Sequence, residues 1–203
     1  TVEANGDYSF QLVNPQPISY VSASLQGLTA GQPVDPVVLP MVSVGNTIAT
    51  ATFTSLEPPP DPDLTKEDNA INSSTQGMGV NDNHVDGASA NKAADWIYVS
   101  FDKDLTDVGF TANNLTSSDG LRWEVWKDGT MQDSGTFNTT NTNQSASVPL
   151  TLSAQGLDSG TVFDEVRLSA DNGDSYRLLT MSVQVQMAPA AQVMNFTLAA
   201  TDM

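Results

Sequence analysis

Short stretches in which apolar and polar residues alternate recur along the whole chain. These stretches are residues 8–13, 47–53, 96–101, 121–126, 146–152, 162–170 and 176–185. A period of two is typical of β-strands that bury one face, and no stretch shows the longer period of an amphipathic helix. Turn signals lie at Asp128–Gly129 and at residues 171–174. The pattern predicts an all-β fold, an antiparallel β-sandwich of about ten short strands with long loops.

The alternation also assigns side chains to faces. In residues 96–101 it places Ile97, Val99 and Phe101 on one face, with Trp96 and Tyr98 on the other. We expect the aliphatic face of this strand to lie in the core and the aromatic face to lie near solvent.

Tryptophan residues are candidates for a ligand-binding surface. Trp123 and Trp126 are three positions apart, so they cannot share a face of a regular strand and one of them should point outward. An outward indole suits a sugar or peptide ligand, although such a side chain more often covers a satellite of the core. Trp96, Trp123 and Trp126 are the candidate ligand-binding residues, with core packing as the alternative.

A proline-rich stretch interrupts the strand pattern at residues 57–63. Proline lacks the N–H group that a central strand needs, so this stretch is expected to be an extended connector. Two or three strands are marginal as a free domain, so the strands of residues 1–56 should pack on the main sandwich. We therefore predict one module over residues 1–187, followed by a tail or edge strand at 188–203.

The 203-residue chain is strongly acidic, with 24 acidic and 7 basic residues and a formal net charge of −17. Such a chain cannot neutralise phosphates, which excludes nucleic acid and an anionic membrane surface as partners. No apolar run approaches the ~18 residues of a membrane span, so we expect no membrane insertion. Solubility and bound divalent cations both explain the charge.

The chain has no cysteine and a single histidine, His84. A secreted domain without disulfides must take its rigidity from a large core or from metal ions, and the composition suits a bacterial surface protein. Zinc would require more His or Cys ligands. No Cys nucleophile and no Gly-x-Ser-x-Gly motif is present, and only one His could act as a base, so we predict no enzymatic activity.

The densest group of oxygen-bearing side chains lies between residues 61 and 95. Two glycines one residue apart let the backbone turn its carbonyls toward a common point, and neighbouring side chains add oxygens. Ca²⁺ takes six to eight oxygen ligands, so this loop is a candidate Ca²⁺ site. A solvated acidic loop is the alternative, and the EF-hand spacing is absent. The candidate ligands here are Gly77, Gly79, Asn81, Asp82 and Asp95.

Asp164 is a further candidate, far along the chain. The alternation places it in register with Val166 and Leu168 on the core side of its strand. A carboxylate that enters the core side needs a partner, and a metal ion is one. The alternative is that Asp164 lies just outside the sandwich, in water.

Several motifs resemble those of giant bacterial RTX adhesins. Residues 5–12, NGDYSFQL, are similar to a G-x-Y-x-F-x-L strand common in that family. Residues 76–80 (QGMGV), an acidic residue before 96–101 (WIYVSF), and 163–168 (FDEVRL) resemble the Ca²⁺-dependent ligand-binding region near the C-terminus of those adhesins. The motifs occur in the family order and the resemblance covers most of residues 1–187.

The resemblance implies a peptide-binding module, because the chain has no room for the sugar-binding insertion that other family modules carry. In the family such a module captures the C-terminal end of a partner protein, and Ca²⁺ helps to hold the peptide carboxylates. By motif, Gly77 and Gly79 would give backbone carbonyls to Ca²⁺, and Asp95 and Asp164 would give carboxylates.

We therefore expect an extracellular, Ca²⁺-dependent adhesion module on a bacterial cell surface. Its partner would be a peptide or protein on a host or neighbouring cell. A carbohydrate-binding module on the same fold is one alternative, which exposed aromatic side chains beside the Ca²⁺ loop would favour. A structural extender domain with Ca²⁺ only as a staple is the other.

Overall fold

The computed structural model describes residues 20–32, 34–43, 45–56, 70–81, 84–88, 94–116, 119–137, 139, 143, 146–171 and 173–185. These residues form twelve β-strands and one 3₁₀ turn, and they contain no α-helix. The strand expected at residues 8–13, the connector at 57–63, Asp82 and the tail at 188–203 all lie outside the described residues.

The strands follow one another along the chain with mostly short connections. They are β1 (Val21–Ser24), β2 (Val37–Ser43), β3 (Asn46–Leu56), β4 (Ile71–Ser74), β5 (Gly77–Val80), β6 (Val85–Asp86), β7 (Trp96–Asn113), β8 (Leu121–Lys127), β9 (Thr130–Phe137), β10 (Val148–Thr151), β11 (Phe163–Ala170) and β12 (Ser175–Val185). The 3₁₀ turn η1 (Ser153–Gln155) follows β10.

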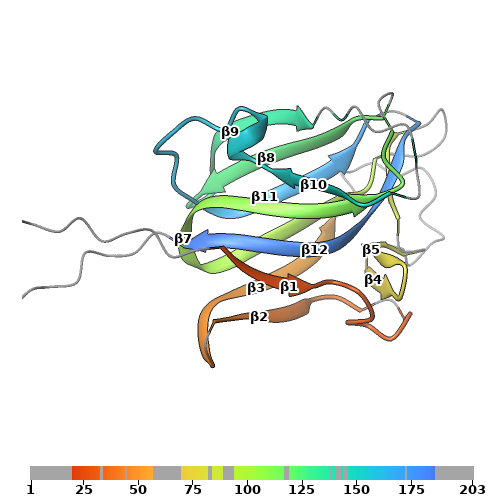
Figure 1. Cartoon of the computed structure of the whole chain (residues 1–203), viewed down its shortest axis with the longest axis horizontal. Helices are drawn as coiled ribbons and strands as arrows, with labels where there is room; N and C mark the ends of the chain where they lie inside the picture. Colours follow the sequence, from red (N-terminus) through yellow and green to blue (C-terminus); the bar gives the residue numbers. More distant parts are fainter. Residues whose placement is uncertain are drawn as a thin grey trace, which may run out of the picture.

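β7 is the longest strand, and its two parts belong to two halves of the fold (Figure 1). One half contains the first part of β7 with β2, β3, β8, β9 and β11, and the other contains its later part with β1, β5, β6, β10 and β12. Residues 96–101 pair with β3, and residues 96–100 also pair with β11 on the other side. Its later part, residues 105–113, pairs with β12 and β10. β8 and β9 continue the sheet beyond β11, β2 lies beyond β3, and β12 also carries β1, β5 and β6. All these pairings are antiparallel, which confirms the all-β, sandwich-like fold.

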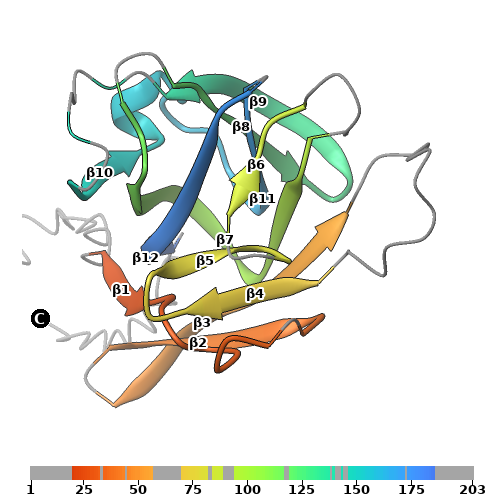
Figure 2. The same ribbon diagram turned by 90° about the vertical axis from the view of Figure 1, so that its right-hand side faces the viewer.

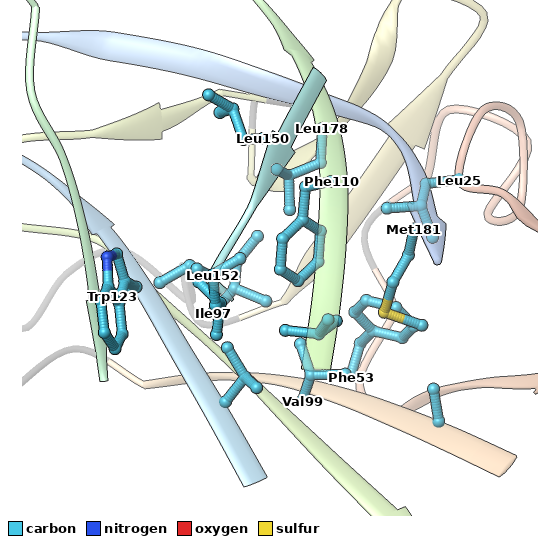
Figure 3. Packing of buried hydrophobic residues seen from close by; sticks show 14 of the residues in the cluster. Leu25, Phe53, Ile97, Val99, Phe110, Trp123, Leu150, Leu152, Leu178 and Met181 are labelled. Carbon is cyan, nitrogen blue, oxygen red and sulfur yellow. The ribbon is translucent and has the colours of Figure 1, made fainter. Parts of the chain in front are cut away.

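The core lies between these two halves (Figure 3). Ile97, Val99 and Phe101 are buried, whereas Trp96 and Tyr98 are half-buried on the opposite face, as the alternation predicts. Large buried side chains from several strands fill the space between the layers: Phe53, Phe110, Trp123, Leu178 and Met181. Each such burial contributes about 1.5–3 kcal/mol, so a core of this size stabilises a chain that has no disulfide.

The turn between β8 and β9 is the two-residue hairpin that the sequence predicts. Asp128 and Gly129 have φ angles of 49° and 75°, and a type I′ turn requires positive φ at both positions. The second predicted turn, residues 171–174, connects β11 and β12 and includes Gly173 with φ of 82°. The Asp128–Gly129 turn joins two strands that pair with each other, β8 and β9. The 171–174 turn is not a hairpin, because β11 and β12 both pair with β7, which lies between them in the sheet.

A proline interrupts the free edge of the sheet at β2, which pairs only with β3 among the described strands. The Thr50 amide donates to Asp102 Oδ1 at 2.6 Å, so the backbone groups of Thr50 point toward β7 and away from β2. Thr50 lies opposite Pro40. The pair is therefore not hydrogen-bonded, and the ring nitrogen of Pro40 faces the free edge, where it offers no N–H group to another strand.

Replacing Pro40 with threonine is expected to increase self-association. The change restores an N–H group on an edge flanked by the exposed side chains of Val38 and Val42. Sedimentation velocity at about 0.5 M salt, which screens the repulsion between acidic copies, should show more dimer than the wild type. The double variant Val38→Lys/Pro40→Thr should return to the wild-type distribution, because an edge lysine opposes pairing. An unchanged distribution for Pro40→Thr would contradict this role of the proline.

The two ends of the described chain lie side by side. Val21 of β1 pairs with Val183 of β12, so the chain enters at Tyr20 and leaves at Val185 on one side, which we call the stem end. β12 begins at the opposite side, where β6 and the 171–174 turn lie (Figure 2). We call that side the loop end.

Candidate functional site

Five aspartates gather in the loops and strand ends of the loop end. They are Asp86, Asp95, Asp119, Asp171 and Asp174. Backbone hydrogen bonds tie these loops together: the Gly87 amide donates to the Asp174 carbonyl at 2.8 Å, and the Asp171 amide donates to the Gly120 carbonyl at 2.9 Å. The carboxylates are therefore held in one region although they come from four separate segments.

Asp174 and Asp119, like Asp95 below, also accept backbone hydrogen bonds through their carboxylates. The Gly120 amide donates to Asp174 Oδ2 at 2.8 Å, and Asp119 Oδ2 accepts the Thr116 amide at 2.6 Å. Asp171 forms an ion pair with Arg122 through Nε. These contacts hold the three side chains in fixed positions.

Asp95 is the most deeply buried acid of the loop end, with 1% of its surface exposed. Its Oδ2 atom accepts the Asp86 amide at 3.0 Å, and its own amide donates to the Asp86 carbonyl at 2.8 Å. Tyr176 lies close by on β12, fully buried, and its hydroxyl forms no hydrogen bond with the described residues. Burial raises the pKa of Tyr176, and the charge of Asp95 raises it further.

Replacing Tyr176 with phenylalanine is expected to raise the free energy of unfolding by about 1 kcal/mol at neutral pH. The phenyl ring fills the same space, and the variant no longer buries a hydroxyl without a partner. Urea unfolding followed by circular dichroism measures the difference. A loss of stability would instead show that the hydroxyl has a favourable partner.

The same variant also tests the pKa of Tyr176. The folded protein holds the phenolic proton more tightly than the unfolded chain does, so this contribution to stability is complete below pH ~10 and is lost as the pH rises above it. Between pH ~9.5 and ~11.5 the wild type should lose more stability than Tyr176→Phe. Parallel pH profiles for the two proteins would argue against the raised pKa.

The structure places the predicted glycine ligands in β5 rather than in an open loop. The Asn81 amide donates to the Ala70 carbonyl at 3.0 Å, so by strand alternation the carbonyl of Gly79, which pairs with Asn72, also points toward β4. Gly77 allows β5 to approach β12: it has φ of 139°, and a Cβ atom there would lie 2.8 Å from Arg177 Cβ. Close packing on β12 therefore accounts for Gly77, and pairing with β4 occupies the carbonyl of Gly79.

Asn81 lies in the turn between β5 and β6, with φ of 53°. Its carbonyl accepts a hydrogen bond from Asn72 Nδ2. The next strand, β6, ends at Asp86 beside Asp95. Of the predicted ligands, the structure thus brings Asn81 and Asp95 to the loop end, while Asp82 lies outside the described residues.

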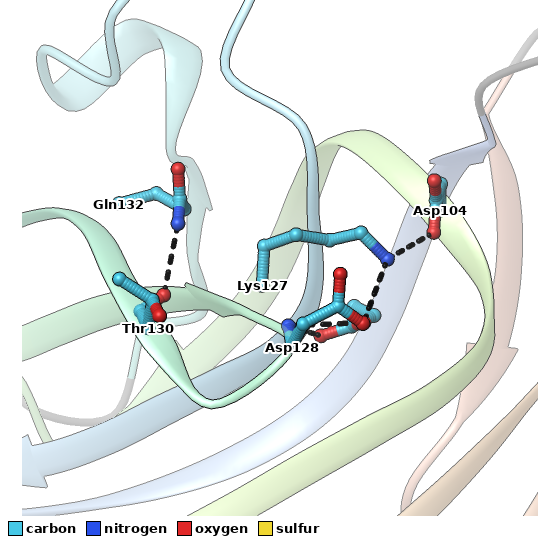
Figure 4. A network of polar contacts seen from close by, with 6 residues as sticks. Asp104, Lys127, Asp128, Thr130 and Gln132 are labelled. Carbon is cyan, nitrogen blue, oxygen red and sulfur yellow. Dashed lines mark hydrogen bonds and ion pairs between the residues drawn. The ribbon is translucent and has the colours of Figure 1, made fainter.

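The prediction that Asp164 faces the core is wrong. A bulge between Phe163 and Glu165 shifts the register of β11, so Phe163 is fully buried and Asp164 lies partly exposed at the stem end. Its Oδ2 atom accepts a hydrogen bond from Lys127 Nζ at 2.8 Å, and the same ammonium reaches Asp104 at 2.8 Å (Figure 4). Hydrogen bonds to Asp104 and Asp164 raise the pKa of Lys127.

Asp164 cannot share an ion with Asp95. It lies five positions along β11 from Ser169, the partner of Trp96, which corresponds to about 16 Å along the strand. Within the described ranges, no three His, Cys, Asp or Glu side chains gather closely enough to hold a metal ion.

The three tryptophans divide between the core and the surface. Trp123 is 1% exposed and packs so closely against Gly135 that a Cβ atom there would lie 2.5 Å from the indole ring. Its choice as a ligand-binding residue is therefore wrong. Trp96 and Trp126 are half-buried on the outer face of the sheet, which confirms that only one of the pair Trp123 and Trp126 points inward.

Trp126 takes part in a stack that the sequence does not reveal. The Arg167 guanidinium lies 3.6 Å from the centroid of the Trp126 ring and 4.7 Å from that of Tyr98. Arg167 Nε donates to Glu165 Oε1 at 2.5 Å, and Trp126 Nε1 donates to Glu124 Oε2 at 2.8 Å. These residues come from β7, β8 and β11, and only the strand register brings them together.

No family model, curated protein or solved structure matches the chain. The resemblance to RTX adhesins rests on its sequence motifs. The described residues contain no helix long and apolar enough to cross a membrane.

Proposed function

We propose that the chain is a Ca²⁺-dependent adhesion module of a large bacterial surface adhesin, which binds a protein or peptide ligand outside the cell. The observation that supports this proposal is that hydrogen bonds join the loops of the loop end, which carry five aspartates between them. Carboxylates and carbonyls are the oxygen ligands that Ca²⁺ prefers. The proposal includes no catalytic activity.

Asp95 and Asn81 are the described residues that we assign to the Ca²⁺ site, together with Asp82. Asp95 is held in place by its two hydrogen bonds with Asp86, so its carboxylate is pre-oriented. A bound Ca²⁺ ion would supply a positive charge that attracts the carboxylate of a peptide C-terminus, which the net charge of −17 would otherwise repel.

Thermal unfolding with and without Ca²⁺ tests the metal site. We expect a higher midpoint in Ca²⁺ than in EDTA, because a ligand that binds the folded state stabilises it by about 2.7 kcal/mol at a concentration 100-fold above Kd. Asp95→Asn should remove the difference, and Asp158→Asn, a change at an exposed residue outside the loop end, should keep it. Equal midpoints for the wild type in Ca²⁺ and EDTA would rule out the site.

Calorimetry with a library of peptides that end in a free carboxylate tests the ligand. Binding should require Ca²⁺ and should be lost when the C-terminus is amidated. Binding that survives EDTA unchanged would overturn the role of the metal ion, even if the peptide itself is the correct ligand.

A further inference from the structure

The strands β1, β2 and β3 form a nearly uncharged part of a strongly acidic chain. Residues 20–56 contain one of the 24 acidic residues, Asp35, and none of the 7 basic residues. Six large apolar side chains are exposed in the described part of the chain, and five of them belong to this segment: Tyr20, Leu28, Val34, Val38 and Val42. The charge and the exposed apolar surface of the molecule are therefore distributed unevenly.

Two of these side chains lie on β2, which pairs only with β3 among the described strands and forms an edge of the sheet (Figure 1). Val38, Pro40 and Val42 alternate with buried or half-buried residues, so all three point to the same side of the strand. Val38 is 59% exposed and Val42 is 48% exposed. Apolar side chains that stay exposed close together mark a surface for interaction with another molecule. We call Val38, Pro40 and Val42 the β2 patch.

The neighbouring strand β3 adds no charge to the β2 patch. Thr52 lies opposite Val38, and Thr47 lies opposite Val42. In the next row, Asp102 of β7 accepts the Thr50 amide at 2.6 Å. It lies two strands from β2, which corresponds to about 10 Å.

The β2 patch belongs to the same side of the sheet as the half-buried tryptophans. Val38 is in register with Thr52, and Thr52 is in register with Ser100. Ser100 lies on the side of β7 that also carries Trp96. We call this side of the sheet the outer face.

The charge of the chain favours a second copy as the partner only at this surface. Two copies that each carry a net charge of −17 repel each other over most of their surface. A contact through the β2 patch brings together two segments with one acidic residue each. The patch also carries no charge that would select an oppositely charged partner.

The β2 patch is complementary to itself. Val38 and Val42 lie two positions before and two positions after Pro40. When the β2 strands of two copies pack in opposite directions about a two-fold axis at Pro40, Val38 of each copy meets Val42 of the other. Asp35 then falls opposite Gly45 in the turn after β2, so the two copies place no acidic residues against each other.

We propose that the β2 patch joins two copies of this chain in a weak, two-fold contact. Pro40 offers no N–H group to another strand, so side chains make the contact and the two sheets do not become continuous. A stable dimer buries about 1,200–2,000 Å², which three side chains from each copy do not reach. The contact therefore forms where copies are held close together, at about millimolar effective concentration. It does not rest on the proposed Ca²⁺ site.

Disulfide trapping tests the arrangement, because the chain has no cysteine that could compete. Val38→Cys is mixed with Val42→Cys in about 0.5 M salt, which screens the repulsion between copies, and a tag on one variant gives the mixed disulfide its own mass. We expect the mixed disulfide to form at least about five-fold faster than a disulfide between two copies of one variant. In the two-fold contact, equivalent residues lie four positions apart, about 13 Å along the strand, which is too far for a disulfide.

Sedimentation equilibrium tests the contact without a covalent bond. The wild type should associate as its concentration approaches about 1 mM, equally in Ca²⁺ and in EDTA. Val42→Lys should weaken this association at least about ten-fold, because a two-fold contact contains each substitution twice. Met131→Lys makes the same change of charge at an exposed apolar residue of β9 and should leave the association unchanged. Circular dichroism confirms that the variants, which change exposed side chains, are folded.

The proposal is overturned if the mixed disulfide forms no faster than the disulfide of a Met131→Cys control, or if Val38→Cys reacts with itself as fast as with Val42→Cys. It is also overturned if folded Val42→Lys associates like the wild type. If the copies do not associate at all, the patch serves a different partner, and the proposal fails. Association that requires Ca²⁺ would assign the contact to the loop end and would overturn it as well.

Discussion

Replacing Trp123 with alanine is expected to lower the free energy of unfolding by about 3–5 kcal/mol. Trp123 is among the largest fully buried side chains, and its removal leaves a cavity between β8 and the opposite layer. Domains of this kind have a total stability of about 5–15 kcal/mol, so the variant should lose a large share of it. Urea unfolding followed by circular dichroism measures the loss without depending on the fluorescence of the missing indole.

Trp126→Ala is the matched control for this prediction. It makes the same chemical change three residues along the same strand, but at a half-buried position of the outer face. It should cost less than half as much as Trp123→Ala, because less apolar surface is buried and no closed cavity forms. Equal losses for the two variants would contradict the burial of Trp123 and the face assignment of β8.

Replacing Asp107 with alanine should lower the free energy of unfolding by about 3 kcal/mol. Asp107 is only 2% exposed. It accepts hydrogen bonds from the Tyr20 hydroxyl and the Ser153 hydroxyl, and from the Ser153 amide at 3.2 Å. Alanine would leave these part-buried donors without their acceptor and would release Tyr20 from β7.

Asp107→Asn keeps an acceptor oxygen and should lose less stability than Asp107→Ala. Asp158→Ala, a change at an exposed aspartate, should stay within about 0.5 kcal/mol of the wild type. Thermal and urea unfolding of the three variants give the comparison. If Asp107→Ala unfolds like Asp158→Ala, the hydrogen bonds to Asp107 do not stabilise the fold.

The alternation of residues predicts β3, β8, β10, β11, β12 and the first part of β7, because burial of one face imposes a period of two on each strand separately. It gives no stretch for β1, β2, β4, β5 or β6. It assigned Ile97 and Val99 to the core correctly. It failed at Asp164, where a bulge shifts the register by a local change that the residue types do not show. It also did not show which of Trp123 and Trp126 points inward, since the pattern indicates only that the two side chains lie on opposite faces of the strand.

The candidate sites were harder to predict, because they depend on which strands are neighbours. Gly77 and Gly79 look like loop glycines in the sequence, but β4 and β12 enclose them in a sheet. Arg167 gains its importance from Tyr98 and Trp126, which lie on two different strands. Pairing between strands distant in sequence brings these residues together. The sequence of one strand alone does not show which other strands it pairs with.

The nearness of Tyr20 and Val185 has a mechanical consequence. Tension applied to the segments that flank the sandwich acts on β1 and β12 at their shared end, so it opens their four residue pairs one after another instead of shearing them together. We expect optical tweezers to record a low-force opening of β1 before the remaining strands unfold; a single high-force event would contradict this order. The load does not pass through β8 or β11, so the outer face and the loop end would keep their shape under tension.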